Sequence, residues 1–227
     1  MDHAPLPHPA CGTAIRGIAA GSRLWLAGQR ADHFAIVERG IVGLAQVTAA
    51  GDVVVLGVFG PADSIGLPAA LERGAYTEDA VALTASVDVL RIATAPVLDA
   101  LPDSPPLAIA VNRALLRYTS ILGNKIDIVT AGSVPRRLAA LFLHLIERFG
   151  RPTPDGATRI DVGLTREQIA QFVGARVETV IRILSRWQKA GWIVGGRGGI
   201  VIGRMDMLRR ILAVRPGDRA AARRSGN

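Results

Sequence analysis

Two charged side chains lie one helical turn apart in a segment whose pattern predicts a helix with two distinct faces. Glu178 and Arg182 are four residues apart, so their side chains share one side of an α-helix. A carboxylate can accept a hydrogen bond from cytosine N4, and a guanidinium can donate two hydrogen bonds to O6 and N7 of guanine. The pair can therefore read neighbouring base pairs, or it can form an ordinary i,i+4 ion pair.

The neighbouring residues favour base reading, because they predict the other parts of a helix-turn-helix unit. Thr165 and Gln168 have the spacing of a capping box at the start of a preceding helix. Gly174 permits a sharp turn between the two helices, and the glycine-rich stretch 192–203 predicts a hairpin after them. An apolar stripe opposite the charged pair predicts the buried face of the second helix: Val180, Ile183, Leu184 and Trp187.

The segment 164–203 resembles the winged-helix domain of the Crp/Fnr superfamily of bacterial transcription regulators. VETVIRILSRWQKAGWI is similar to the recognition helix on the Fnr side of that family. Arg176 departs from the family pattern, which usually places a capping Ser or Thr there, so we expect it to contact a phosphate instead. The resemblance implies that Glu178 and Arg182 read base edges and that Thr165, Arg166 and Thr179 lie near phosphates. We also expect Ile181 and Val177 in the base-reading set, and Arg176, Arg186 and, at the tip of the glycine-rich hairpin, Arg197 among the phosphate contacts.

Ile181 is a second departure from the family, since Fnr-like proteins place Ser there and Crp-like proteins Gly. An exposed isoleucine can pack on the methyl group of thymine but cannot form a hydrogen bond. Alternatively, Ile181 turns inward onto the core of the unit and contacts no base. The resemblance to Fnr-like regulators implies a palindromic DNA site with TTGAT-like halves.

The charge of the chain is concentrated in its C-terminal part. The 227 residues carry a net charge of +8, and 49% of them are hydrophobic, which indicates a globular chain. Residues 1–130 hold 9 Lys and Arg against 12 Asp and Glu, a net charge of −3. Residues 131–227 hold 18 against 7, a net charge of +11. This asymmetry predicts a polyanion partner, double-stranded DNA, for one domain only.

Between residues 21 and 92, short β-branched runs alternate with glycine turns, which predicts an antiparallel β-roll (jelly roll). The order of the turns resembles the cyclic-nucleotide-binding domain that precedes the winged helix in the family. The expected fold class is therefore α+β. We expect a sensor β-roll over residues 1–104, a dimerisation helix over 105–132, and a winged helix-turn-helix domain with a basic tail over 133–227.

The positions that hold a nucleotide in the family are altered in this chain. In nucleotide-binding members of the family, a Gly-Glu-Leu element holds the ribose, and an Arg followed by Ser or Thr holds the phosphate. By the resemblance, Gly66-Leu67-Pro68 and Glu78-Asp79 stand at these positions here. Two carboxylates at the latter positions would repel a phosphate, so we expect no binding of cyclic AMP. The roll is then either a scaffold or a sensor of another signal, such as nitric oxide through haem. The expected effector pocket is therefore degenerate and consists of Gly66, which is kept, and the altered Leu67, Glu78 and Asp79.

No cofactor is evident from the sequence, and haem is the alternative. His3, His8 and Cys11 lie in a Pro- and Ala-rich arm without the CxxC or HxxxH spacing of a metal site. His33 and His144 are isolated candidates for haem ligation, although an isolated histidine is more often a packing residue. The single cysteine and the absence of a leader or membrane-spanning pattern predict a soluble protein of the cytoplasm.

Residues 107–130 predict a long helix after Pro105-Pro106. Its apolar residues recur at steps of three and four, close to a coiled-coil seam. The seam could pack on the roll, but a regular seam beside a DNA-reading helix favours a parallel homodimer. A dimer would place two recognition helices about 34 Å apart along the duplex. The predicted seam consists of Val111, Leu115, Tyr118, Leu122, Ile126 and Val129.

The sequence lacks the GxSxG, P-loop and HExxH motifs of common enzyme classes. We therefore expect a homodimeric, sequence-specific transcription regulator and not an enzyme. The family resemblance implies contact with RNA polymerase, as an activator more often than as a repressor. The alternatives for its signal are haem- or redox-sensing of nitrogen oxides or low oxygen, or constitutive action without an effector.

Overall fold

The computed structural model describes residues 12–196 and 199–213, and the chain divides into two compact units between Lys125 and Ile126. The long helix α3 (Pro105–Thr130) belongs to the first unit over most of its length. The boundaries at residues 104 and 132 that the sequence suggests stay predictions. None of the described helices is long and apolar enough to cross a bilayer.

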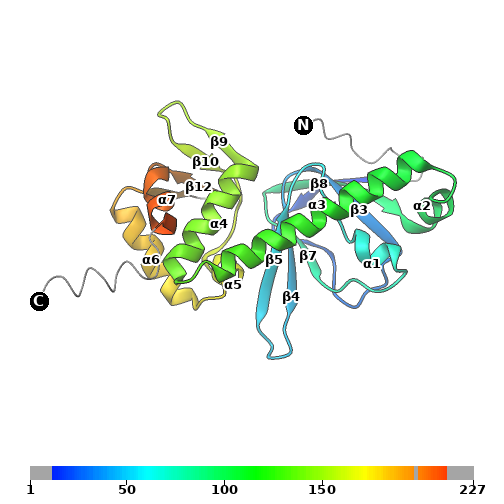
Figure 1. The fold of residues 1–227 in the computed structure, drawn as a ribbon, viewed down its shortest axis with the longest axis horizontal. Coiled ribbons are helices and arrows are strands. Elements are labelled where there is room, and N and C mark those ends of the chain that lie inside the picture. Colours follow the sequence, from blue (N-terminus) through cyan, green and yellow to red (C-terminus); the bar gives the residue numbers. More distant parts are fainter. Residues whose placement is uncertain (1–11, 197–198, 214–227) are drawn as a thin grey trace, which may run out of the picture. The chain divides into compact units, whose positions relative to one another are not determined.

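The first unit is the predicted β-roll of antiparallel strands (Figure 1). Its two four-stranded sheets have the orders β1-β8-β3-β6 and β2-β7-β4-β5. Glycines with positive φ angles turn the chain at Gly28, Gly40 and Gly51, where the sequence places turns. Two short helices, α1 (Leu67–Leu71) and α2 (Thr94–Ala100), complete the unit. The strands are β1 (Gly12–Ala19), β2 (Arg23–Trp25), β3 (His33–Arg39), β4 (Val42–Val47), β5 (Val53–Phe59), β6 (Ser64–Ile65), β7 (Asp79–Ala82) and β8 (Ser86–Ala93).

Both sheets and α3 share one hydrophobic core. Phe34 from one sheet and Phe59 from the other are buried in the same cluster, together with Val111 and Ile121 of α3. Leu115 and Tyr118 pack against this cluster. Half of the predicted dimer seam is therefore used to seat α3 on the roll of its own chain, which is the alternative that the sequence left open.

The opposite face of α3 carries large apolar side chains that nothing in the described chain covers. Ile109, Leu116 and Ile126 are 52%, 71% and 63% exposed. Together with Asn112, Thr119 and Gly123 they recur at steps of three and four, which is the spacing of a helix–helix seam. We call this set the outer stripe: Ile109, Asn112, Leu116, Thr119, Gly123 and Ile126.

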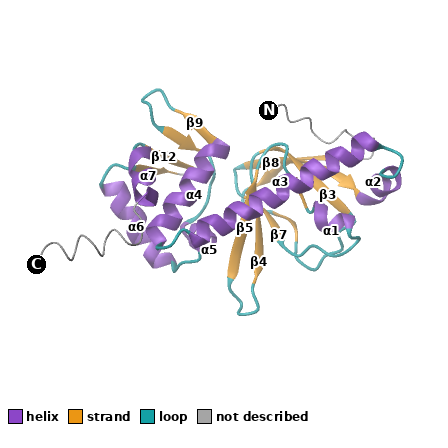
Figure 2. Cartoon of the chain, in the orientation of Figure 1, coloured by secondary structure: helices purple, strands orange, loops and turns teal. Residues whose placement is uncertain are grey.

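The second unit is a winged helix-turn-helix domain in which helices pack on a small sheet (Figure 2). The sheet has the strand order β11-β12-β10-β9. Pro135 lies in the first turn of α4, a position that needs no backbone N–H. The elements are α4 (Val134–Phe149), β9 (Gly150–Pro152), β10 (Thr158–Ile160), α5 (Arg166–Val173), α6 (Val177–Lys189), β11 (Ile193–Gly196), β12 (Gly199–Ile202) and α7 (Met205–Ala213).

Candidate nucleic-acid interface

Hydrogen bonds define both ends of α5, the helix before the charged pair. The Thr165 hydroxyl accepts from the backbone N–H of Gln168 at 3.1 Å, and the Gln168 side chain accepts from the Thr165 N–H at 2.9 Å. The predicted capping box is therefore present. At the other end Gly174 adopts the left-handed conformation, with φ of 60°. Arg137 donates to the carbonyls of Val173 and Gly174 at 2.6 and 2.8 Å, so α4 holds the turn that leads into α6.

The two faces of α6 are separated as the sequence predicts. Val180 and Leu184 are fully buried, and Trp187 packs against Phe142 and Trp192 at centroid distances of 6.2 and 6.0 Å. Ile183, the fourth member of the predicted stripe, is partly buried.

On the other face of α6, Glu178 and Arg182 are exposed, and Ile181 between them is 45% exposed. Ile181 thus turns outward, which contradicts the alternative that it packs inward. In the part of the chain that the structure describes, neither Glu178 nor Arg182 makes an ion pair or a side-chain hydrogen bond. The simple i,i+4 ion pair is therefore not formed, and both groups are available to a ligand. Val177 is partly buried at the start of the helix.

The side chains expected to contact phosphates differ in their exposure. At the start of α6 and on it, Arg176 and Arg186 are exposed, and Thr179 is partly buried. Arg166 is instead half-buried, and this burial lowers the pKa of its guanidinium. A Cβ atom on Gly195 of the wing would lie 3.3 Å from Arg166 Nη2, so Arg166 lies against β11. Thr165 uses its hydroxyl in the cap, and Arg197 lies outside the described residues.

The altered effector pocket is built differently from the expectation. Glu78 is 5% exposed and accepts a hydrogen bond of 2.7 Å from the Tyr118 hydroxyl of α3. Asp79 instead accepts from the N–H of Ala27 at 2.8 Å and lies 3.7 Å from Arg23. Glu78 lies in the bend before β7 and Asp79 is the first residue of that strand, and their carboxylates have different partners. Of the two, only the Glu78 carboxylate is buried. The expected pair of repelling carboxylates is thus corrected to a single buried one.

The Gly66-Leu67 end of this pocket is filled by aromatic and aliphatic side chains. Leu67 is fully buried at the start of α1. Gly66 has φ of +71°, and a Cβ atom on it would lie 2.8 Å from the ring of Tyr76 and 3.0 Å from that of Trp25. Trp25 and Tyr76 are stacked on each other at 4.3 Å. Glycine is therefore required here both by its backbone conformation and by the two rings.

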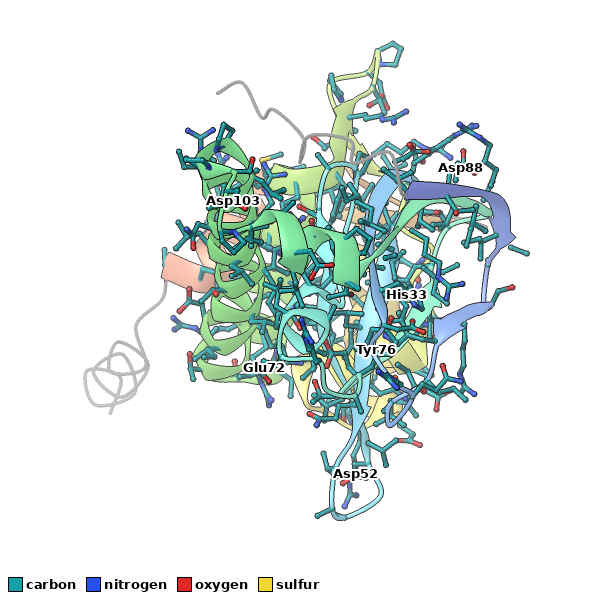
Figure 3. All side chains as sticks on the ribbon, turned by 90° about the vertical axis from the view of Figure 1, so that its right-hand side faces the viewer. His33, Asp52, Glu72, Tyr76, Asp88 and Asp103 are labelled. Atoms are coloured by element: carbon teal, nitrogen blue, oxygen red, sulfur yellow. The ribbon has the colours of Figure 1, made fainter. Side chains whose placement is uncertain are left out.

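The isolated histidines occupy separate units. His33 lies beside Tyr76 at a centroid distance of 5.7 Å (Figure 3), and its Nδ1 is in contact with Asp32 Oδ1 and, at 3.0 Å, with Arg91 Nη2. His144 lies on α4 in the second unit and is partly buried. Within residues 12–196 and 199–213, no group of three His, Cys, Asp or Glu side chains could hold a metal ion. His3, His8 and Cys11 lie outside these ranges.

The second unit should lose stability on acidification because of His144. Burial, and then the charge of Arg148, lower the pKa of this imidazole from its ordinary value of 6.5. As the pH falls below 6.5, the unfolded chain takes up a proton before the folded one, so the free energy of unfolding decreases until the folded pKa is passed. Thermal melting at about pH 7.5 and about pH 5.5 measures this loss. A His144→Gln variant that kept the full pH dependence would contradict the assignment.

Comparison with known proteins shows to which family the chain belongs. Residues 15–103 match the profile of the cyclic nucleotide-binding domain, and residues 136–211 match that of the Crp-like helix-turn-helix domain. The chain is 30% identical over 173 residues to a CRP-like cAMP-activated global transcriptional regulator of Mycobacterium tuberculosis, a match that covers 76% of each chain. The chain belongs to the Crp/Fnr superfamily. It is a transcription regulator with a helix-turn-helix DNA-binding domain, and the matched relatives are not enzymes.

Solved structures of Crp/Fnr proteins share the fold at low sequence identity. A CRP-family transcriptional regulator from Thermus thermophilus is 20% identical, with a TM-score of 0.74 over 89% of this chain and 97% of that one. FixK2 from Bradyrhizobium japonicum is 17% identical, with a TM-score of 0.74 over 90% of this chain and 98% of that one. Within the Crp/Fnr architecture, Glu178, Ile181 and Arg182 lie on the second helix of the helix-turn-helix unit.

Proposed function

We propose that this Crp/Fnr protein binds a palindromic, TTGAT-like DNA site as a homodimer and regulates transcription in the cytoplasm, where the chromosome is found. One observation carries the proposal: Glu178, Ile181 and Arg182 form an exposed stripe on α6 without partners in the described chain, opposite the face that carries the buried Val180, Leu184 and Trp187. Arg182 donates to guanine, Glu178 accepts from cytosine, and Ile181 packs on a thymine methyl group.

Two arginines at the edge of this stripe support the proposed orientation of α6 on DNA. Arg176 precedes α6, and Arg186 follows Arg182 by four residues on the same side of the helix. Contacts of such residues to phosphates position a recognition helix without reading sequence. Arg166 is partly buried and lies near Gly195 of the wing strand β11, and its contact with a phosphate stays a prediction. By family membership, the DNA-bound dimer contacts RNA polymerase.

The homodimer is proposed to form through the outer stripe of α3. The stripe replaces the seam suggested by the sequence, because Val111, Leu115 and Tyr118 pack on the roll. Gly123 lies in this stripe, and a Cβ atom there would meet nothing within 4 Å. A glycine inside a helix costs about 1 kcal/mol relative to alanine. In the proposed dimer, a glycine at position 123 lets the second helix approach closely, which explains a glycine inside α3.

Selection of binding sites from random DNA tests the reading face. Arg182→Ala should weaken specific binding by about 1–3 kcal/mol and remove the preference for guanine at one position of each half-site. Arg186→Ala is the matched control, since it removes the same side chain one turn away. It should weaken all sequences alike and lower the slope of affinity against salt by about one. Retention of the guanine preference in Arg182→Ala would show that α6 is not the reading helix.

A further inference from the structure

Helix α3 lies so close to strand β5 that no side chain fits between them at Gly57. A Cβ atom on Gly57 would lie 2.9 Å from Cγ2 of Ile121 and 3.2 Å from Cε2 of Phe59. Both of these side chains are buried in the core of the roll. The φ angle of Gly57 is not in the left-handed region, so space and not backbone conformation requires glycine. The helix and the strand are therefore in direct contact.

Beside this contact, Tyr118 occupies the space between α3 and the roll. Its ring lies 5.4 Å from that of Phe59, and its hydroxyl donates to Glu78 Oε1 at 2.7 Å. The Thr77 hydroxyl donates to the other carboxylate oxygen. Burial, and then the charge of Glu78, raise the pKa of the Tyr118 phenol, which keeps it protonated as a donor.

The Glu78 carboxylate depends on these two hydroxyl groups. It is almost fully buried, and no cation of the described chain lies within ion-pair distance of it. A buried carboxylate that loses one of its donors carries a large desolvation cost. A ligand that displaced Tyr118 would therefore have to supply a hydrogen-bond donor to Glu78. A phosphate group, which brings negative charge, would be repelled.

The residue next to Tyr118 makes a second anchor. Arg117 Nη1 lies 3.4 Å from Oδ1 of the buried Asp63, whose Oδ2 accepts from the N–H of Gly60 at 2.7 Å. Neighbouring side chains on a helix point about 100° apart. Two anchors in these directions fix the rotation of α3 about its axis as well as its position along the roll.

We propose that α3 itself fills the effector site of the roll, that Tyr118 is the positioning residue that holds it there, and that the regulator therefore binds DNA without a small-molecule effector. The inference rests on the proposed function, since the outer stripe and the link to the DNA-binding unit both lie on α3. Fixed rotation of α3 keeps the outer stripe turned away from the roll. The dimer interface is then always presented, with no ligand needed to set it.

The first test is direct binding to the purified full-length protein. Calorimetry with cyclic AMP and with cyclic GMP should show no heat of binding, and neither nucleotide should change the affinity for a selected operator fragment by more than about twofold. Micromolar binding of either nucleotide would overturn the inference, whether or not the protein binds DNA. A protein that binds neither nucleotide nor any DNA would contradict the proposed function and, with it, effector-free DNA binding.

The second test uses two matched tyrosine variants. Tyr118→Phe removes the donor to Glu78 and should lower the operator affinity at least about tenfold, which corresponds to about 1.4 kcal/mol. Tyr76→Phe removes another buried hydroxyl of the same roll, which donates to the His33 carbonyl at 2.6 Å. It should lower the melting temperature but leave operator affinity unchanged. Equal operator affinities for the two variants would overturn the positioning role of Tyr118.

Glu78 and Gly57 supply further variants of the same contact. Glu78→Gln keeps an acceptor for Tyr118 and should bind the operator like the wild type, whereas Glu78→Leu should lose affinity as Tyr118→Phe does. Gly57→Ala should speed amide hydrogen exchange in α3 around Ile121, because the added methyl group pushes the helix outward. Combining it with Ile121→Ala should restore slow exchange. Unchanged exchange in Gly57→Ala would show that α3 is not held tightly against β5.

Discussion

Replacing Trp187 by alanine is expected to lower the free energy of unfolding of the second unit by about 3–5 kcal/mol, the usual cost of truncating a buried tryptophan. Trp187 is 4% exposed and contacts Phe142 of α4 and Trp192 at the entry to the wing. Its removal leaves a cavity between α4, α6 and the wing. For a domain of about 100 residues, this loss corresponds to a fall in melting temperature of more than about 12 °C.

Scanning calorimetry measures this fall, and a second variant on the same helix provides the control. Ile181→Ala also truncates an apolar side chain of α6, but one that is exposed. Its effect on stability should stay within about 0.5 kcal/mol, whereas its effect should appear in the DNA sequence preference. If Trp187→Ala melted like the wild type, the buried and the reading face of α6 would have been assigned the wrong way round.

Leu116→Asp is expected to convert the proposed dimer into a monomer. Leu116 is 71% exposed in the single chain, so the substitution costs the monomer little. In a symmetric dimer it would bury two unpaired carboxylates, each at a cost of several kcal/mol. The dissociation constant should rise by at least about a hundredfold, since 1.4 kcal/mol corresponds to a factor of ten.

Sedimentation equilibrium distinguishes the two states of association. Val194→Asp is the matched control, because Val194 is also a largely exposed apolar residue but lies on the wing strand β11. This variant should sediment as the wild type does. A Leu116→Asp protein that remained dimeric at micromolar concentration would place the interface elsewhere than on the outer stripe.

The sequence predicted the helix-turn-helix unit in detail because its signals are local. The capping box needs only Thr165 and Gln168 at the right spacing, and the turn needs only Gly174. The two faces of α6 follow from a periodicity that its 13 residues display fully. In each case the physical cause lies within a few residues of its effect.

The partner of α3 could not be predicted in the same way. Periodicity shows that the stripe through Val111, Leu115 and Tyr118 is covered, but it does not show whether the roll or a second chain covers it. The outer stripe was missed because Asn112, Thr119 and Gly123 interrupt its apolar residues. The hydrogen bond from the Tyr118 hydroxyl to Glu78 joins residues that are 40 positions apart in the sequence, and no local pattern indicates such a pair.

The start of α6 has a thermodynamic consequence. Arg176 occupies the N-cap position without forming a side-chain cap, in contrast to Thr165 at the start of α5. The backbone N–H groups of Val177 and Glu178 therefore have no acceptor within the described chain, and a DNA phosphate can supply one. In the proposed complex, a phosphate at this position would complete the hydrogen bonding of the first turn of α6, which is already helical from Val177 in the free chain. Part of the free energy of DNA binding would then come from capping these N–H groups.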